Sequence, residues 1–156
     1  MINKKSVILL FHGTSNYNDS KEMYDNIIKK FENEFKDFYI IDAYSSSAIR
    51  KMISNDEIFP SIENRLKELK NKNIEEVYIA PIVILQNKDY SACFHAMAKF
   101  KKDFSIIKYG ESTLSIPEDY YNMVSIIKKE FKQQQGGTIM GIYLNPENVD
   151  FQEVLN

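Results

Sequence analysis

The sequence predicts an α/β fold: a single open, mostly parallel, twisted sheet of four or five strands with helices on both faces. Two observations support this fold class. Near-continuous apolar runs rich in branched side chains, typical of parallel strands buried on both faces, recur along the chain. Segments with apolar residues at helical spacing alternate with these runs. This alternation indicates βαβ units joined by right-handed crossovers.

The first strand is predicted over residues 6–11, and a helix follows it, capped by Asn18, Asp19 or Ser20. The remaining predicted elements are a strand over 38–44, a short helix over 48–53, a helix starting at Pro60–Ser61, a strand within 75–85, a helix marked by Tyr90, Phe94 and Met97 that ends near Lys101–Lys102, a strand over 104–109, a helix from Pro117 to a stop at 133–137, and a fifth strand over 138–144. The fifth strand is unusual because no helix of useful length follows it.

The composition is that of an ordinary globular protein. The chain has 156 residues, of which 44% are hydrophobic and 27% are charged. This length suits one core. We therefore expect a single domain over residues 1–156, with its core at about residues 5–134 and an extra strand and tail at 137–156.

Charge and hydropathy argue against several partners. The net charge is −2, and the lysines are spread among acidic residues without forming a basic patch, so nucleic acid is not an expected partner. No stretch approaches the roughly 20 apolar residues of a membrane span.

The first apolar run is too short for a signal peptide and ends at His12 rather than at a cleavage site. The single cysteine, Cys93, rules out an internal disulfide, and a cytoplasmic location follows.

Candidate functional residues follow three of the predicted strands. In an open α/β sheet, ligands bind outside the carboxyl ends of the strands. The candidates there are His12 with Gly13, Thr14 and Ser15, then Ser45–Ser47 with Arg50, and finally residues 86–90 with Asp89. A histidine and a carboxylate in one cleft can bind a divalent metal or take protons from a substrate. Hydroxyls and N–H groups at helix starts suit carboxylates or phosphates.

Structural interpretations of the same residues remain open. A lone histidine at a strand end is often structural, and Asp89 and the serines at 45–47 are also suited to capping helices. Arg50 fits a surface charge equally well. His95 falls inside a predicted helix as a packed or solvated side chain, and Cys93 is most simply a core residue.

Several enzyme classes are excluded by missing motifs. The first strand is not followed by Gly-x-Gly-x-x-Gly or by a Walker-type loop. The chain also lacks a Gly-x-Ser-x-Gly nucleophile elbow. Phe11 precedes His12 where a histidine phosphatase would have arginine. Two histidines and one cysteine cannot build a closed structural zinc site without carboxylates.

From Ser6 to Phe131 the chain resembles the class II tetrapyrrole chelatases. The likeness is closest to the amino-terminal half of the anaerobic sirohydrochlorin cobaltochelatase of the CbiK and CbiX type. It depends on the order of three segments: Phe11-His12-Gly13-Thr14-Ser15, Tyr44-Ser45-Ser46-Ser47-Ala48-Ile49-Arg50-Lys51-Met52, and Pro81-Ile82-Val83-Ile84-Leu85-Gln86-Asn87-Lys88-Asp89-Tyr90.

The resemblance implies a role for each candidate residue. His12 matches the His-Gly turn of the small family members, and Asp89 falls where the family has histidine or glutamate. Both would face the metal and the pyrrole nitrogens, as metal ligands and catalytic groups. The residues expected to hold the substrate are Gly13, Thr14, Ser15, Ser45, Ser46 and Arg50.

The function that the resemblance implies is that of a lyase in cobalamin biosynthesis, which inserts a divalent metal into sirohydrochlorin. The metal is a substrate, cobalt first with nickel or iron as alternatives, and no tightly bound cofactor is expected. Small family members pair as homodimers, so a homodimer or a second half-sized chain is the expected partner. Ile142-Tyr143 replaces the His-Gly that opens the second half of long members. Two alternatives therefore stay open: a non-catalytic tetrapyrrole- or metal-binding half domain, and one subunit of a two-chain chelatase.

Overall fold

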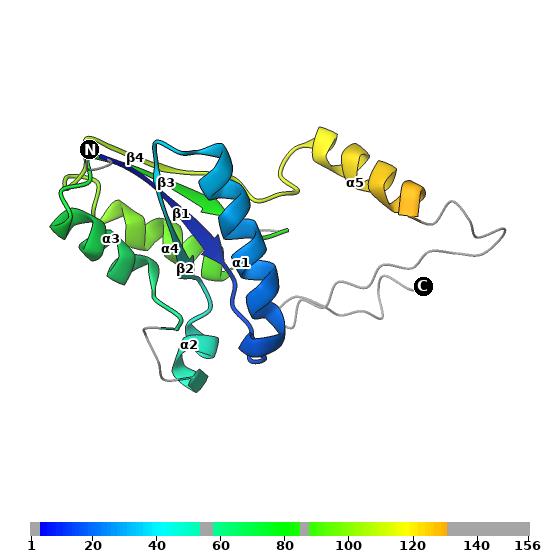
Figure 1. Ribbon diagram of the computed structural model, residues 1–156, viewed down its shortest axis with the longest axis horizontal. Helices are drawn as coiled ribbons and strands as arrows, with labels where there is room; N and C mark the ends of the chain where they lie inside the picture. Colours follow the sequence, from blue (N-terminus) through cyan, green and yellow to red (C-terminus); the bar gives the residue numbers. More distant parts are fainter. Residues whose placement is uncertain (1–3, 54–57, 85–87, 131–156) are drawn as a thin grey trace. The chain divides into compact units, whose positions relative to one another are not determined.

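The computed structural model describes residues 4–53, 58–84 and 88–130. The chain divides into two compact units, residues 1–120 and 121–156. The elements are β1 (Lys5–Phe11), α1 (Tyr17–Glu34), β2 (Tyr39–Tyr44), α2 (Ser47–Ile53), α3 (Ile62–Asn71), β3 (Glu76–Pro81), α4 (Lys88–Ala98), β4 (Ile106–Tyr109) and α5 (Pro117–Glu130), as labelled in Figure 1.

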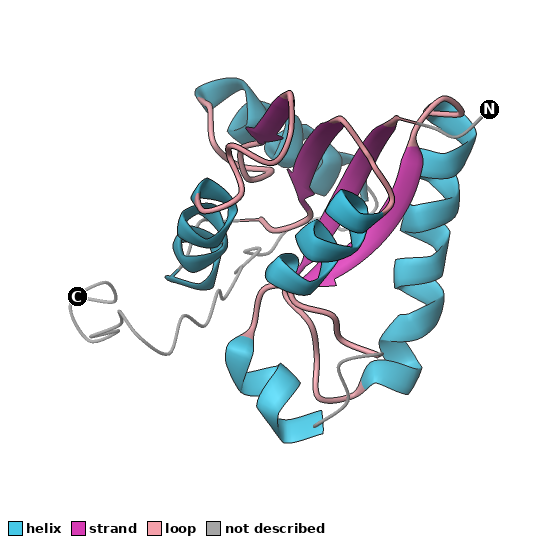
Figure 2. Cartoon of the chain, turned by 90° about the vertical axis from the view of Figure 1, so that its left-hand side faces the viewer, coloured by secondary structure: helices cyan, strands magenta, loops and turns pink. Residues whose placement is uncertain are grey.

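The four described strands form one sheet in the order β2-β1-β3-β4. All neighbouring pairs are parallel. The cartoon in Figure 2 shows the twist of this sheet and helices on both of its faces. The predicted fold class is therefore confirmed. The predicted fifth strand, 138–144, lies outside the described residues.

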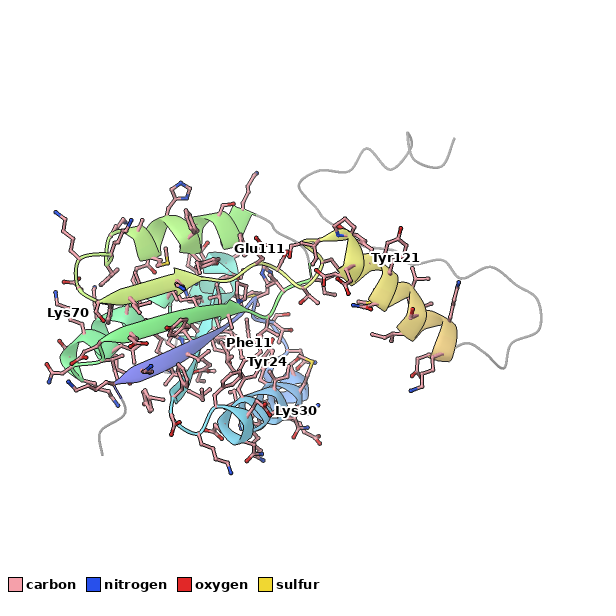
Figure 3. All side chains as sticks on the ribbon, turned by 90° about the horizontal axis from the view of Figure 1, so that it is seen from above. Phe11, Tyr24, Lys30, Lys70, Glu111 and Tyr121 are labelled. Atoms are coloured by element: carbon pink, nitrogen blue, oxygen red, sulfur yellow. The ribbon has the colours of Figure 1, made fainter. Side chains whose placement is uncertain are left out.

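Strand β1 is buried on both faces, which explains its uninterrupted apolar sequence. Ile8 and Leu10 pack into a core cluster with side chains of α3 and α4. Leu9 and Phe11 pack on the opposite face, beneath α1, where the rings of Phe11 and Tyr24 lie 4.6 Å apart. Figure 3 shows α4 and α1 on opposite sides of the sheet, with Phe11 and Tyr24 between the sheet and α1.

Two helix starts show what the local sequence can and cannot predict. Helix α3 begins at Ile62, next to the predicted start at Pro60–Ser61. Ser61 caps it, because its Oγ accepts the backbone N–H of Asn64 at 3.1 Å. The predicted start of α1 at residues 18–20 is wrong, since the helix begins at Tyr17. Gly13, with φ of 97°, turns the chain soon after β1 ends. The loop between β1 and α1 is therefore short, and α1 begins before the predicted residues 18–20.

Some element ends also differ from the prediction. Strand β3 ends at Pro81, short of the predicted range, which ran to residue 85. Beyond it, the carbonyl groups of Val83 and Ile84 accept hydrogen bonds from residues 113 and 114. Helix α4 ends at Ala98, before the predicted 101–102, and the chain continues in tighter turns. Strand β4 begins at residue 106 rather than 104.

Helix α5 begins at Pro117, as predicted. The Asp119 carboxylate accepts the backbone N–H groups of Ser115 and Ile116, at 3.1 and 3.2 Å. A carboxylate that satisfies free N–H groups at a helix start stabilises that start. Within the residues described, none of the helices has the length and apolar character needed to cross a bilayer.

Candidate active site

The ends of β1 and β2 bring His12 and Ser45 together. Leu10 is opposite Ala43 in the parallel register, so the residues two positions further on, His12 and Ser45, are also neighbours. Backbone hydrogen bonds continue past the strands, from Ser45 N to Phe11 O at 2.8 Å and from Ser46 N to His12 O at 3.0 Å. Strand alternation directs both side chains to the face covered by α3 and α4.

Helix α4 adds a carboxylate to this edge. Asp89 is the second residue of the helix, and its Oδ2 lies 3.7 Å from Nδ1 of His12. Ser45 Oγ lies 3.5 Å from the same nitrogen. The side chains of His12 and Asp89 are 48% and 32% exposed, so a bound molecule can reach them.

The contacts of His12 distinguish its two ring nitrogens. In the part of the chain that is described, the carboxylate and the hydroxyl both approach Nδ1. At 3.7 Å the Asp89 carboxylate is beyond hydrogen-bond distance of Nδ1, and it acts through its negative charge, which favours the tautomer that carries the proton on Nδ1. Nε2 is then the nitrogen with a free lone pair, and it is suited to bind a metal ion or to accept a proton.

Two other predicted site residues fix the loop after β2. Arg50 Nη1 donates to the carbonyl groups of Tyr44 and Ser45, at 2.5 and 3.0 Å. The buried Ser46 Oγ accepts the backbone N–H of Ile49 at 3.4 Å, which is the capping arrangement that the sequence left open. These contacts hold Ser45 next to His12.

The remaining candidates line the turn after β1. Thr14 Oγ1 accepts the backbone N–H of Asn16 at 3.2 Å, and Ser15 is exposed. A Cβ on Gly13 would lie 3.5 Å from Ile49 Cγ2, so this turn packs against α2. Gly13, Thr14 and Ser15 therefore form an exposed to half-buried rim beside His12.

A small cavity of about 80 Å³ lies next to Asp89, and sequence reasoning did not anticipate it. Its lining combines charged, hydroxyl and apolar side chains: Ser45, Ser47, Arg50, Ile62, Glu63, Asp89, Ala92, Cys93 and Ala96. Glu63 lies in the first turn of α3, directly after the Ser61 cap. The cap signal locates that turn, but only the tertiary fold shows that it meets α4.

Cys93 and His95 lie outside the pair formed by His12 and Asp89. Cys93 is buried, as predicted, and burial raises the pKa of its thiol from 9.0 to about 12, with a further upward contribution from the charge of Glu63. The thiol is therefore protonated at neutral pH. His95 is exposed on α4, with Nδ1 2.7 Å from the carbonyl oxygen of Ser91.

The described residues do not form a complete metal centre. Across residues 4–53, 58–84 and 88–130, no group of three or more His, Cys, Asp or Glu side chains is arranged to hold a metal ion. His12 and Asp89 offer two ligand groups.

An open parallel sheet with an exposed imidazole and carboxylate at its carboxyl edge defines a class of α/β proteins that bind small molecules at strand ends. Within this class, the chain belongs to the cobalt chelatase (CbiK) family, whose model matches residues 5–144. The match confirms the resemblance to tetrapyrrole chelatases and supports a cobalt chelatase-type function. A search of curated proteins found no match.

Proposed function

We propose that this protein inserts cobalt(II) into sirohydrochlorin in cobalamin biosynthesis, with the His12–Asp89 pair performing the chemistry. The observation that carries the proposal is the 3.7 Å approach of Asp89 Oδ2 to His12 Nδ1 at a half-exposed sheet edge. Membership of the cobalt chelatase family supports both the reaction class and the choice of metal.

Metal insertion requires removal of the pyrrole N–H protons. Neutral His12 presents Nε2 to the macrocycle and accepts one of the two protons there, which produces an imidazolium; the other proton leaves to water. The negative charge of Asp89, beside Nδ1, stabilises that imidazolium. General-base catalysis by a positioned imidazole typically contributes about 10²–10⁴-fold to a rate.

The metal is a substrate, and its ligands change during insertion. Nε2 of His12, before it accepts a proton, or a carboxylate oxygen of Asp89 would hold the arriving ion. Because Asp89 lies beside Nδ1, the two groups would act on the ion in turn rather than bind it together. The four macrocycle nitrogens then replace these and the water ligands. Cobalt, nickel and iron all bind imidazole and carboxylate ligands, so the pair itself does not select among them.

The substrate's peripheral carboxylates need donors around this pair. Thr14 and Ser15 lie on the rim after β1 and offer hydroxyl groups. Arg50 uses Nη1 on two carbonyl groups, and the rest of its guanidinium supplies positive charge at the cavity next to Asp89. Gly13, Ser45 and Ser46 shape this surface through their backbone.

A second chain would complete the binding cleft. His12 and Asp89 are open on the side away from the sheet, with 48% and 32% of their side chains exposed. A homodimer or a second half-sized subunit would provide the wall that faces them. The single cysteine, Cys93, is in keeping with an enzyme of the reducing cytoplasm.

Anaerobic visible spectroscopy with sirohydrochlorin and cobalt(II) tests the proposal. We expect insertion faster than in the protein-free control, and a loss of about 100-fold or more in His12→Ala. His95→Ala is the matched control, because His95 is exposed on α4 and contacts its own helix backbone. Wild-type insertion rates in His12→Ala would refute the assignment.

A non-catalytic binding protein is the second candidate. It is favoured by the lack of a third His, Cys, Asp or Glu ligand around the pair within the described ranges. This alternative predicts that sirohydrochlorin changes its spectrum on binding, while insertion proceeds no faster than in free solution. The same spectroscopic assay with sirohydrochlorin and cobalt(II) therefore distinguishes the two functions.

A further inference from the structure

Two tyrosines connect the first turn of α4 to the end of β4. Tyr109 Oη donates to the carbonyl oxygen of Tyr90 at 3.1 Å. Tyr90 Oη donates to the carbonyl oxygen of Gly110 at 2.9 Å. The two rings meet edge to face, with centroids 5.0 Å apart and an interplanar angle of 81°. Tyr109 thus holds the backbone of Tyr90, and Tyr90 holds the backbone of Gly110, the residue after β4.

The sheet fixes the β4 side of this connection. Tyr109 is paired with Ile79 of β3, and it packs against the same core cluster as α3 and α4. Gly110 N donates to Ile79 O at 2.8 Å, and a Cβ on Gly110 would come within 3.2 Å of that oxygen. The carbonyl group that receives Tyr90 is therefore held close to β3.

The α4 side is fixed by aromatic packing over one helical turn. The ring of Tyr109 also contacts Phe94 edge to face, with centroids 5.6 Å apart. Tyr90 and Phe94 are four residues apart, so they lie on one face of α4. Burial raises the pKa of the Tyr109 hydroxyl, which keeps it a hydrogen-bond donor.

This connection lies directly beside the reactive pair. The residue before Tyr90 is Asp89, whose carboxylate faces His12. His12 is held by the backbone bonds of β1 and its neighbours, whereas Asp89 depends on where α4 begins. A shift of the first turn of α4 would change the distance between Asp89 and His12 without altering either residue.

We propose that Tyr90 and Tyr109 are positioning residues that set the distance between Asp89 and His12 and thereby the tautomer of His12. The inference rests on the proposed function of that pair. Neither tyrosine is assigned a contact with the substrate. Removing either hydroxyl should weaken catalysis through Asp89 alone.

Conservative variants test this role in the full-length protein. In Tyr109→Phe and Tyr90→Phe we expect the turnover number for cobalt insertion to fall about tenfold, because small misplacements of catalytic groups are costly. The KM for sirohydrochlorin should stay within about twofold, since the rim is untouched. Tyr39→Phe is the control, because its hydroxyl contacts Lys72 and strand β2 begins at this residue, far from the carboxyl edge.

A double-variant comparison separates positioning from general structural support. If the tyrosines act through Asp89, Tyr109→Phe should cause no further loss when Asp89 is already replaced by asparagine. A loss that persists in the Asp89→Asn background would overturn the proposal. Should Tyr109→Phe fail to fold, Tyr90→Phe removes only the second hydrogen bond and carries the same comparison.

A measurement without substrate distinguishes this inference from the proposed function. Nitrogen-15 NMR of the imidazoles reports which nitrogen of His12 carries the proton. We expect the Nδ1 tautomer in the wild type and a shift toward the Nε2 tautomer in both tyrosine variants, with His95 unchanged. An unaltered His12 tautomer would overturn the inference. If wild-type protein inserts no metal, the proposed function fails, and the tautomer alone decides the role of the tyrosines.

Discussion

The carboxylate of Asp89 lies 3.7 Å from Nδ1 of His12, so the first turn of α4 and the end of β1 contribute to the same local site. Ser45 Oγ approaches that nitrogen from β2 at 3.5 Å. Groups from β2 and α4 therefore approach one ring nitrogen of His12, and both contacts given among the described residues are at Nδ1 rather than Nε2.

Replacing Asp89 with asparagine tests the importance of its charge. Asparagine keeps the size of the side chain but cannot stabilise an imidazolium at His12 electrostatically. We expect the turnover number to fall about tenfold or more, with little change in KM for the macrocycle. Steady-state insertion assays measure both values. Glu32→Gln, on the exposed part of α1, is the control. Equal turnover in Asp89→Asn and wild type would show that the charge is not used.

Replacing Arg50 with alanine tests whether the loop after β2 needs its anchor. The change removes two hydrogen bonds to the carbonyl groups of Tyr44 and Ser45. We expect a loss of about 1–3 kcal/mol in the free energy of unfolding, measured by urea denaturation, and a higher KM for sirohydrochlorin.

Arg50→Lys refines this comparison, since lysine keeps a charge but lacks the planar guanidinium. It should recover part of the substrate affinity and less of the stability. Lys29→Ala, on the exposed side of α1, controls for the loss of one positive charge. If Arg50→Ala and Lys29→Ala behave alike, the anchoring role is wrong.

Cys93 should make stability depend on alkaline pH. Its thiol pKa rises from 9.0 to about 12 in the folded protein, chiefly because of burial. A raised folded-state pKa means that the unfolded chain loses its proton first. Stability should therefore be unaffected by this group below about pH 9 and should decline as pH rises from about 9 toward 12.

The comparison of wild type with Cys93→Ala isolates this contribution from other alkaline titrations. Urea denaturation at several pH values should give a flatter decline in the variant between pH 9 and 12. Thiol labelling at pH 8 provides a second readout, because only the unfolded protein should react quickly. Parallel declines in the two proteins, or rapid labelling under native conditions, would contradict the burial effect.

The sequence was sufficient to locate the candidate site because strand ends are local features. The buried apolar segment of β1 shows that His12 follows the end of the strand. Because side chains alternate between the two faces of a sheet, His12 lies on the same face as Ser45. Asp89 followed from its position after the third strand. The parallel register between β1 and β2 then places His12 next to Ser45.

The surroundings of the site could not be predicted in the same way. Glu63 and Cys93 border the cavity because α3 packs against α4, and helix packing is not encoded in a short motif. Tyr90 and Tyr109 look like ordinary core aromatics in the sequence. Their hydrogen bonds, from Tyr109 to the carbonyl group of Tyr90 and from Tyr90 to that of Gly110, depend on the pairing of β4 with β3 and on the position of α4.

The most direct measurement is a double-variant cycle of single-turnover cobalt insertion with His12→Ala, Asp89→Asn and the combined variant. If the two residues act as one unit, the combined variant should be no slower than His12→Ala alone. Independent losses that multiply in the combined variant would contradict the account, because Asp89 would then act without His12.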